Sequence, residues 1–203
     1  MRNAGGWKTL NDAVFTGSTS FVDVTFANGA EFNGAHFATY AKFERATFNK
    51  GASFDNASFD GGAGFDRAHF TSRASFEGTT FDDVVGFTKT RFMAAASFDR
   101  ATISVAGIFD QATFASLTTF DRTVFEQPVT FHKTEFAGSL LFDSTPEIIH
   151  RMIARQPHHR WDHVDLEGAR LLRPAERHFI PPGWRLEADN KEAAVLRREH
   201  GNA

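Results

Sequence analysis

The feature that most constrains this chain is a phenylalanine that recurs at steps alternating between six and five residues. Every phenylalanine except Phe179 lies in this register, and only Ile103 replaces the expected ring. The residue two positions before a unit centre is small or β-branched, most often alanine, except for Leu140 before the last centre. The alternation gives a repeat of 11 residues made of two units. The unit centres fall at positions 15, 21, 26, 32, 37, 43, 48, 54, 59, 65, 70, 76, 81, 87, 92, 98, 103, 109, 114, 120, 125, 131, 136 and 142.

This period suits neither a helix nor a long strand. On an α-helix, steps of five and six residues rotate successive side chains by about 140° and 240°, which would scatter the rings around the axis. In an extended segment, the small residue and the phenylalanine two positions later share one face. The next unit follows too soon for a full strand and a reversal, so each unit must be a short extended segment followed by a corner of constant hand. The pattern predicts an all-β solenoid with the rings inside.

Units such as Ala46-Thr47-Phe48 resemble the repeats of pentapeptide-repeat proteins, in a phenylalanine-rich variant that alternates five- and six-residue units. The resemblance covers about residues 11–143. It implies a right-handed, four-sided parallel β-helix with four units per coil, and hence about six coils of 22 residues. The family is mostly non-enzymatic. Its best-understood members protect bacterial type II topoisomerases from drugs or toxins by presenting an acidic surface that imitates DNA.

The repeat divides the chain into three regions. We expect an N-terminal cap at residues 1–10, the solenoid at 11–145 and a partly helical capping region at 146–203. A helix near 146–155 would begin with a Ser-x-x-Glu capping box and an early proline. A second helix is expected near 190–200, closed by a glycine.

Part of the C-terminal region repeats the solenoid pattern in a weaker form. Leu166 and Leu171 are five residues apart, with Ala169 two positions before Leu171, which predicts one further repeat-like turn. Trp161, Phe179 and Trp184 are the expected apolar anchors of the cap. The region should cover the open end of the solenoid or mediate a homodimer.

No pattern in the sequence indicates catalysis, a cofactor or a metal site. The chain has no cysteine, and no P-loop, nucleophile elbow or dinucleotide-binding fingerprint appears. The histidines at 150, 158, 159 and 163 lack the spacing of a metal site and are interpreted as solvated side chains of the cap. The Gly-rich run at 61–64 falls between two unit centres, where turn geometry explains it. We therefore expect a protein that is not an enzyme.

One line of carboxylates stands out on the predicted surface. An acidic residue follows the same phenylalanine in successive coils, and we call this set the acidic stripe: Asp55, Glu77, Asp99, Asp121 and Asp143. Asn33 holds the equivalent position one coil earlier. Two interpretations remain open: aspartate suits the corner because its side chain can bond to the local backbone, or the stripe binds a basic partner. The equivalent acidic residues at the other five-residue step have basic neighbours, so that corner should neutralise itself.

These observations favour a protein-binding or scaffold module. The alternative is a DNA mimic that protects or modulates a bacterial type II topoisomerase such as DNA gyrase. Net charge is only −3, so neither nucleic acid nor an anionic membrane is an expected direct partner. The N-terminus has no apolar signal-peptide core and the chain has no long apolar run, which predicts a soluble, cytoplasmic protein.

Overall fold

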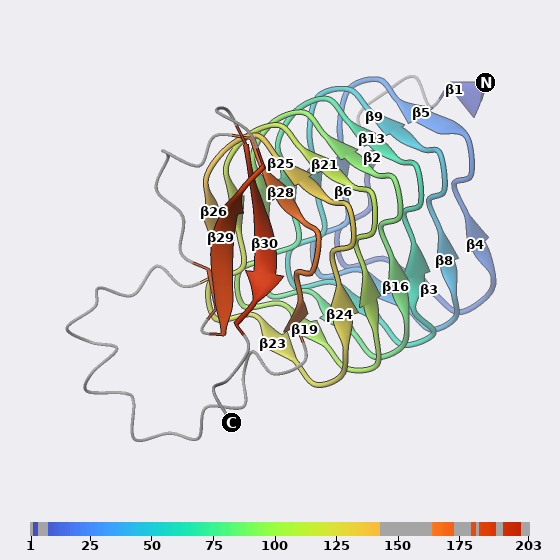
Figure 1. The fold of residues 1–203 in the computed structure, drawn as a ribbon. Coiled ribbons are helices and arrows are strands. Elements are labelled where there is room, and N and C mark those ends of the chain that lie inside the picture. The colour runs from blue at the N-terminus through green and yellow to red at the C-terminus, as the bar shows by residue number, and fades with distance from the viewer. Residues whose placement is uncertain are drawn as a thin grey trace.

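The chain winds into a right-handed parallel β-solenoid of about six coils (Figure 1). The computed structural model describes residues 2–3, 8–142, 164–172, 180–181, 183–189 and 193–199, and every regular element within these ranges is a β-strand. The predicted fold class is therefore confirmed for this part of the chain. The predicted helix near 146–155 lies outside the described residues.

Four sheets form four faces, which the chain visits in the same order in each coil. Face 1 contains β1 (Arg2–Asn3), β5 (Val24–Phe26), β9 (Thr47–Phe48), β13 (His69–Phe70), β17 (Arg91–Phe92), β21 (Thr113–Phe114), β25 (Glu135–Phe136), β28 (Arg170–Leu171), β30 (Ala194–Arg198) and β29 (Trp184–Ala188). Face 2 contains β2 (Lys8–Thr9), β6 (Ala30–Glu31), β10 (Ala52–Ser53), β14 (Ala74–Ser75), β18 (Ala96–Ser97), β22 (Thr118–Thr119) and β26 (Leu140–Leu141). Face 3 contains β3 (Val14–Phe15), β7 (His36–Phe37), β11 (Ser58–Phe59), β15 (Thr80–Phe81), β19 (Thr102–Ile103) and β23 (Val124–Phe125). Face 4 contains β4 (Thr19–Ser20), β8 (Ala41–Lys42), β12 (Ala63–Gly64), β16 (Val85–Gly86), β20 (Gly107–Ile108), β24 (Val129–Thr130) and β27 (Val164–Asp165).

Strand pairing follows the 22-residue coil that the resemblance implies. Ser58 pairs with Thr80 and Phe59 with Phe81, and the other parallel pairs up to β26 keep the same offset of 22 residues. Each strand is so short that much of the coil-to-coil bonding continues into the flanking residue. One example is the Phe54 N–H, which donates to the Ser75 carbonyl at 2.8 Å. The four-unit coil predicted from the sequence is confirmed.

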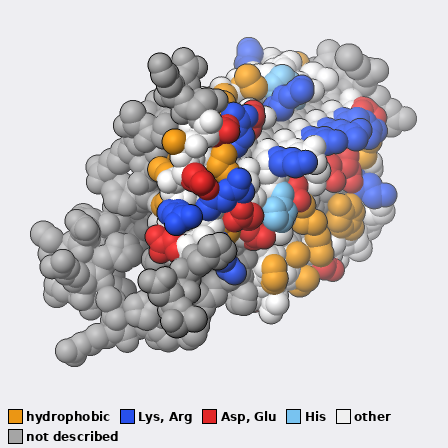
Figure 2. Space-filling view, viewed as in Figure 1, with side chains coloured by type: hydrophobic (Ala, Val, Ile, Leu, Met, Phe, Trp, Pro, Cys, Tyr) orange, Lys and Arg blue, Asp and Glu red, His pale blue; other side chains and the backbone are white. Residues whose placement is uncertain are grey.

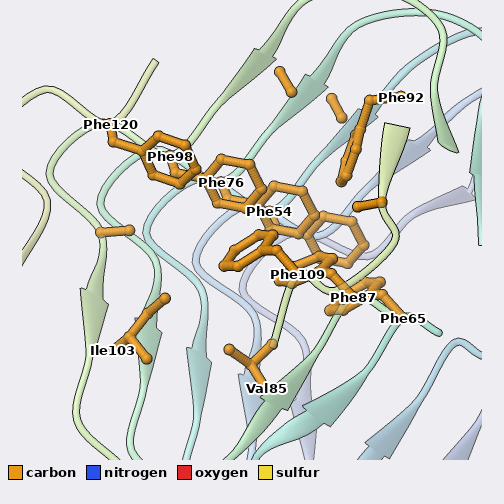
Figure 3. Close-up of a cluster of buried hydrophobic side chains, with 14 of the residues drawn as sticks. Phe54, Phe65, Phe76, Val85, Phe87, Phe92, Phe98, Ile103, Phe109 and Phe120 are labelled. Atoms are coloured by element: carbon orange, nitrogen blue, oxygen red, sulfur yellow. The ribbon is translucent and has the colours of Figure 1, made fainter. Parts of the chain in front are cut away.

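Stacked phenylalanines fill the interior (Figure 3). Along one face the rings lie nearly parallel, as between Phe54 and Phe76, whose centroids are 5.0 Å apart at an interplanar angle of 1°. Rings of face 2 meet rings of face 4 edge to face at the centre of the solenoid. Phe54 and Phe65, for example, have ring centroids 5.3 Å apart and an interplanar angle of 82°. Both arrangements suit the quadrupole of an aromatic ring. Ile103 takes its place in the face 3 column and is fully buried.

Small residues complete the interior. Most are alanine, but five are buried threonines: Thr79, Thr90, Thr118, Thr123 and Thr134. The Thr90 hydroxyl donates to the Phe65 carbonyl at 2.7 Å, and Thr79, Thr123 and Thr134 make the equivalent bond. The Thr118 hydroxyl donates to the Ser116 carbonyl at 3.4 Å. A buried hydroxyl without a partner would destabilise the fold, so these bonds explain why threonine can replace alanine there.

The five-residue steps turn through a left-handed backbone conformation. Nine of the ten non-glycine residues with positive φ in the described ranges lie two positions after a unit centre of face 2 or face 4, and the tenth, Asp12, lies two positions after Leu10, one coil before Phe32. Arg67 and Lys89 are examples, with φ of 58° and 60°. This conformation is costly for residues with a Cβ and is tolerated best by glycine and asparagine. The tight corner therefore fixes the local backbone whatever side chain the sequence supplies.

Parallel pairing extends beyond the predicted limits of the solenoid at both ends. β2 pairs with β6 ahead of residue 11, and the Leu10 N–H donates to the Glu31 carbonyl at 2.7 Å. After β26 the next pairs are Val129 with Val164 and Glu135 with Arg170, at an offset of 35 residues. The predicted repeat-like turn is confirmed, because Leu166, Ala169 and Leu171 are fully buried.

The predicted helix near residues 190–200 is wrong where the structure describes it. β30 is a strand that pairs antiparallel with both β28 and β29, so a hairpin closes face 1 at the C-terminal end of the solenoid (Figure 1). Ala194 and Leu196 point inward and are buried, as is the predicted anchor Trp184. The open edge of β28 supplies unpaired backbone groups, and pairing with them outweighs the helical preference of a short segment.

Candidate functional site

The acidic stripe lies on the corner between faces 2 and 3. Asp55, Glu77, Asp99 and Asp121 each follow the buried phenylalanine of face 2, so parallel pairing stacks them one above another. All four side chains are half-buried. The fifth predicted member, Asp143, lies outside the described residues.

Side-chain oxygens on this corner cap the backbone of the following coil. Asp55 Oδ1 accepts a hydrogen bond from the Glu77 N–H at 3.0 Å, and Asp99 Oδ1 accepts one from the Asp121 N–H at 2.8 Å. Asn33 makes the same bond through its amide oxygen, with the Asp55 N–H at 3.2 Å. The corner preference for aspartate therefore has a structural cause, although the bond goes to the next coil and not to the local backbone. Each such bond uses one of the two oxygens of an aspartate carboxylate.

Two arginines on the same corner reduce the charge of the stripe. Arg100 forms an ion pair with Glu77, and Arg122 Nε lies 3.8 Å from Asp121 Oδ2. Both arginines occupy the left-handed corner position. Four carboxylates against two guanidinium groups leave the described part of the corner negative, with Asp55 and Asp99 making no ion pair among the described residues.

The corner between faces 4 and 1 balances its charge, as predicted from the sequence. Asp66 and Asp110 again cap the next coil, accepting from the Thr88 N–H at 2.8 Å and the His132 N–H at 3.0 Å. Their cationic neighbours occupy the left-handed position: Arg45, Arg67, Lys89 and Lys133. Figure 2 shows Lys and Arg side chains mixed with Asp and Glu side chains on this side of the molecule.

One ion pair on this second corner has well-defined geometry. The Arg45 guanidinium donates to both oxygens of Asp23, through Nε at 2.6 Å and Nη2 at 2.7 Å. This hydrogen bond to Arg45 holds the pKa of the Asp23 carboxyl below its ordinary value. The pair links one coil to the next on the surface.

The described residues contain no group of three metal-ligating side chains close enough to hold an ion. The four histidines considered in the sequence lie outside them. Gly62 has φ of +79°, and a Cβ there would collide with the carbonyl of Val84, so the Gly-rich run is a corner required by packing. No helix in the described ranges is long and apolar enough to cross a membrane.

Sequence reasoning placed Asp55, Glu77, Asp99 and Asp121 on one corner, where the structure has them, but missed the bonds of Asp55 and Asp99 to the next coil. The available signal was Asn33, because an uncharged side chain at the same position indicates that the hydrogen bond matters as well as the charge. Sequence reasoning also missed a surface hollow on face 2 that is lined by Gly29, Gly51 and Ser75, among others.

Comparison with known proteins agrees with the geometry of the repeat. The family model of pentapeptide repeats matches residues 10–58, 43–91 and 54–102, and thus covers the chain from 10 to 102. No curated protein and no solved structure matches the chain. With four units per coil, a phenylalanine at each unit centre up to Phe98 and this match, residues 10–102 of the chain are repeats of the pentapeptide-repeat family.

Proposed function

We propose that this pentapeptide-repeat protein is a non-catalytic, cytoplasmic interaction module of a bacterial cell, and that its acidic stripe binds a basic surface of a partner protein. The observation that supports this most is the line of half-exposed carboxylates on one corner, one in each coil from Asp55 to Asp121. The stripe remains negative where the opposite corner is balanced. The C-terminal region is a second candidate surface, through which two copies would form a homodimer.

Physical chemistry gives the stripe a reason to bind. Neighbouring coils are about 4.8 Å apart, so the carboxylates repel one another weakly through water and counter-ions. A line of Lys and Arg side chains on a partner would relieve that repulsion and accelerate association by electrostatic steering. Binding through such a stripe should weaken steeply as ionic strength rises.

The test separates charge from corner structure. Asn33 already caps the next coil with an amide, so a variant with Asp55→Asn, Glu77→Gln, Asp99→Asn and Asp121→Asn should keep the fold while losing its negative charge. The control removes three carboxylate charges from the opposite corner through Glu44→Gln, Asp66→Asn and Asp110→Asn. Proteins retained from native lysate at low and high salt are identified, and their affinities are then measured with purified components.

The expected result is a partner that binds wild type and the control alike, dissociates at high salt, and binds the stripe variant at least about tenfold more weakly, because several charge-assisted contacts are lost. Equal affinity of the partner for wild type and the stripe variant would show that the carboxylates only stabilise the corner and do not bind the partner.

The regular spacing of the carboxylates also favours a second candidate, imitation of a nucleic-acid backbone towards a type II topoisomerase. Gyrase supercoiling is measured with and without a gyrase poison, in the presence of wild type or the stripe variant. Inhibition or protection by wild type alone would support this function. If wild type affects supercoiling neither with nor without the poison, the topoisomerase function is rejected and the general interaction module remains the proposal.

A further inference from the structure

Face 2 carries a surface hollow of about 360 Å³ over β6, β10 and β14. It exists because Gly29 and Gly51, at the corner leading into β6 and β10, have no side chains to cover it. Their φ values of +96° and +99° lie where glycine is strongly favoured. Arg73 takes the equivalent place in the next coil and bounds the hollow there. Its volume lies in the range of small-molecule sites, about 300–1,000 Å³.

The hollow contains a buried hydroxyl without a partner. Ser75 points outward from β14 but is only 6% exposed, and its Oγ makes no hydrogen bond. The serines of the adjacent coils differ, because Ser53 Oγ donates to Asn33 and Ser97 Oγ accepts from the Asp99 N–H at 3.4 Å. A buried polar group without a partner is rare and costs stability, so the Ser75 hydroxyl indicates a place for a hydrogen-bonding ligand.

Charged side chains of both signs line the hollow. Lys50 and Arg73 are exposed and form no ion pair with any described residue. Glu31 and Asp55 supply the negative charge, and each already accepts one hydrogen bond, from the Thr9 hydroxyl at 3.3 Å and the Glu77 N–H at 3.0 Å. The two cations come from the corner before face 2, whereas Asp55 lies on the corner after it. The two positive and two negative charges of the lining cancel in total, but the cations and Asp55 lie on opposite sides of face 2.

We propose that this hollow binds a small zwitterion of the α-amino-acid class. The ligand carboxylate lies towards Lys50 and Arg73 and accepts a hydrogen bond from the Ser75 hydroxyl. Its ammonium group lies towards Glu31 and Asp55. A neutral ligand with separated charges matches a neutral lining with separated charges, whereas a dianion would meet two carboxylates and a cation two basic groups. The hollow shares Asp55 with the acidic stripe, but the proposal for its ligand does not rest on a partner protein of the stripe.

The experiment is an NMR titration of the ¹⁵N-labelled full chain with L-alanine. N-acetyl-L-alanine, which lacks the ammonium charge, and L-alaninamide, which lacks the carboxylate, serve as matched probes. Saturable shifts are expected at the amides of Gly51, Arg73 and Ser75 with L-alanine. Each analogue should bind at least about tenfold more weakly, because it loses one set of charge-assisted hydrogen bonds.

Variants test the residues. Ser75→Ala should weaken L-alanine binding by about three- to tenfold, and should leave the melting temperature of the free protein unchanged or raise it. Ser97→Ala, one coil further on, is the matched control and should bind as wild type does. Lys50→Gln with Arg73→Gln should abolish binding, whereas Arg67→Gln with Lys89→Gln, on the corner between faces 4 and 1, should not affect it. The proposal is overturned by the absence of saturable shifts, by equal affinity for all three probes, or by unchanged binding to Ser75→Ala.

Discussion

A phenylalanine in the middle of this solenoid contacts other rings in every direction. Phe65 stacks between Phe43 and Phe87, with centroids 4.8 and 5.0 Å away, and meets the ring edges of Phe54 and Phe76 at 5.3 and 5.4 Å. All five rings are fully buried. The neighbours are held by their own coils, so they cannot collapse into a space that one ring leaves.

We therefore expect Phe65→Ala to lower the free energy of unfolding by about 3–5 kcal/mol. Phe15→Ala is the control, because Phe15 is only partly buried at the N-terminal end of its column and should cost clearly less. Urea unfolding monitored by circular dichroism measures both. Equal costs would mean that the central rings are not packed more tightly than the terminal ones.

The element that departs most from the repeat is the hairpin of β29 and β30. It is bound to the last turn through backbone bonds, such as the Leu196 N–H to the Ala169 carbonyl at 2.8 Å. Glu167 adds a side-chain link, accepting from Arg197 Nη1 at 2.6 Å and the Arg198 N–H at 3.2 Å. The hydrogen bond from Arg197 holds the pKa of the Glu167 carboxyl below its ordinary value.

Because this pKa is lowered by folding, the link stabilises the hairpin above the ordinary carboxyl pKa and is lost as the pH falls through the lowered value. Hydrogen-exchange protection of the Leu196 amide should therefore decrease in acid. Glu167→Gln should show lower protection at neutral pH and little further change in acid. Asp23→Asn, which removes a similar pair on a distant coil, should leave the Leu196 amide unaffected. Identical pH profiles for wild type and Glu167→Gln would contradict this assignment.

At the scale of the whole molecule, each coil contacts only the coils before and after it. Removing residues 57–78 joins Asn56 to Thr79, and the face 3 strand at Thr80–Phe81 then takes the place of Ser58–Phe59. Every later residue keeps its face, because 22 residues are one coil. Solenoids of this kind tolerate the loss of whole repeats, since their stability is approximately a sum over neighbours.

We expect the variant lacking residues 57–78 to be a shorter, cooperatively folded β-protein. Deleting only residues 57–61 should destabilise it far more, because the alternation of five and six is broken and later units move to other faces. Thermal unfolding followed by circular dichroism compares the two deletions. If both unfold the protein equally, the coils are not independent units.

The sequence by itself determined the set of buried side chains, and the number of faces and the coil length followed from the resemblance of its units to pentapeptide repeats. A phenylalanine every five or six residues with a small residue two positions earlier can be buried in only one way, so local spacing was enough. With that coil length, Asp55 and Asp99 fall on one corner, because positions separated by whole coils of 22 residues must stack. The same spacing fits carboxylates that stabilise the corner and carboxylates that bind a basic partner, so spacing does not distinguish these two roles.

Only the tertiary structure decided the features that depend on atoms from different coils. The bond from the Glu77 N–H to Asp55, the unpartnered hydroxyl of Ser75 and the hollow above it arise where one coil meets the next. The strand at Ala194–Arg198 is the clearest case, since its own sequence suits a short helix. The free edge of β28 supplied hydrogen-bond partners that an isolated segment lacks, and that pairing decided its conformation.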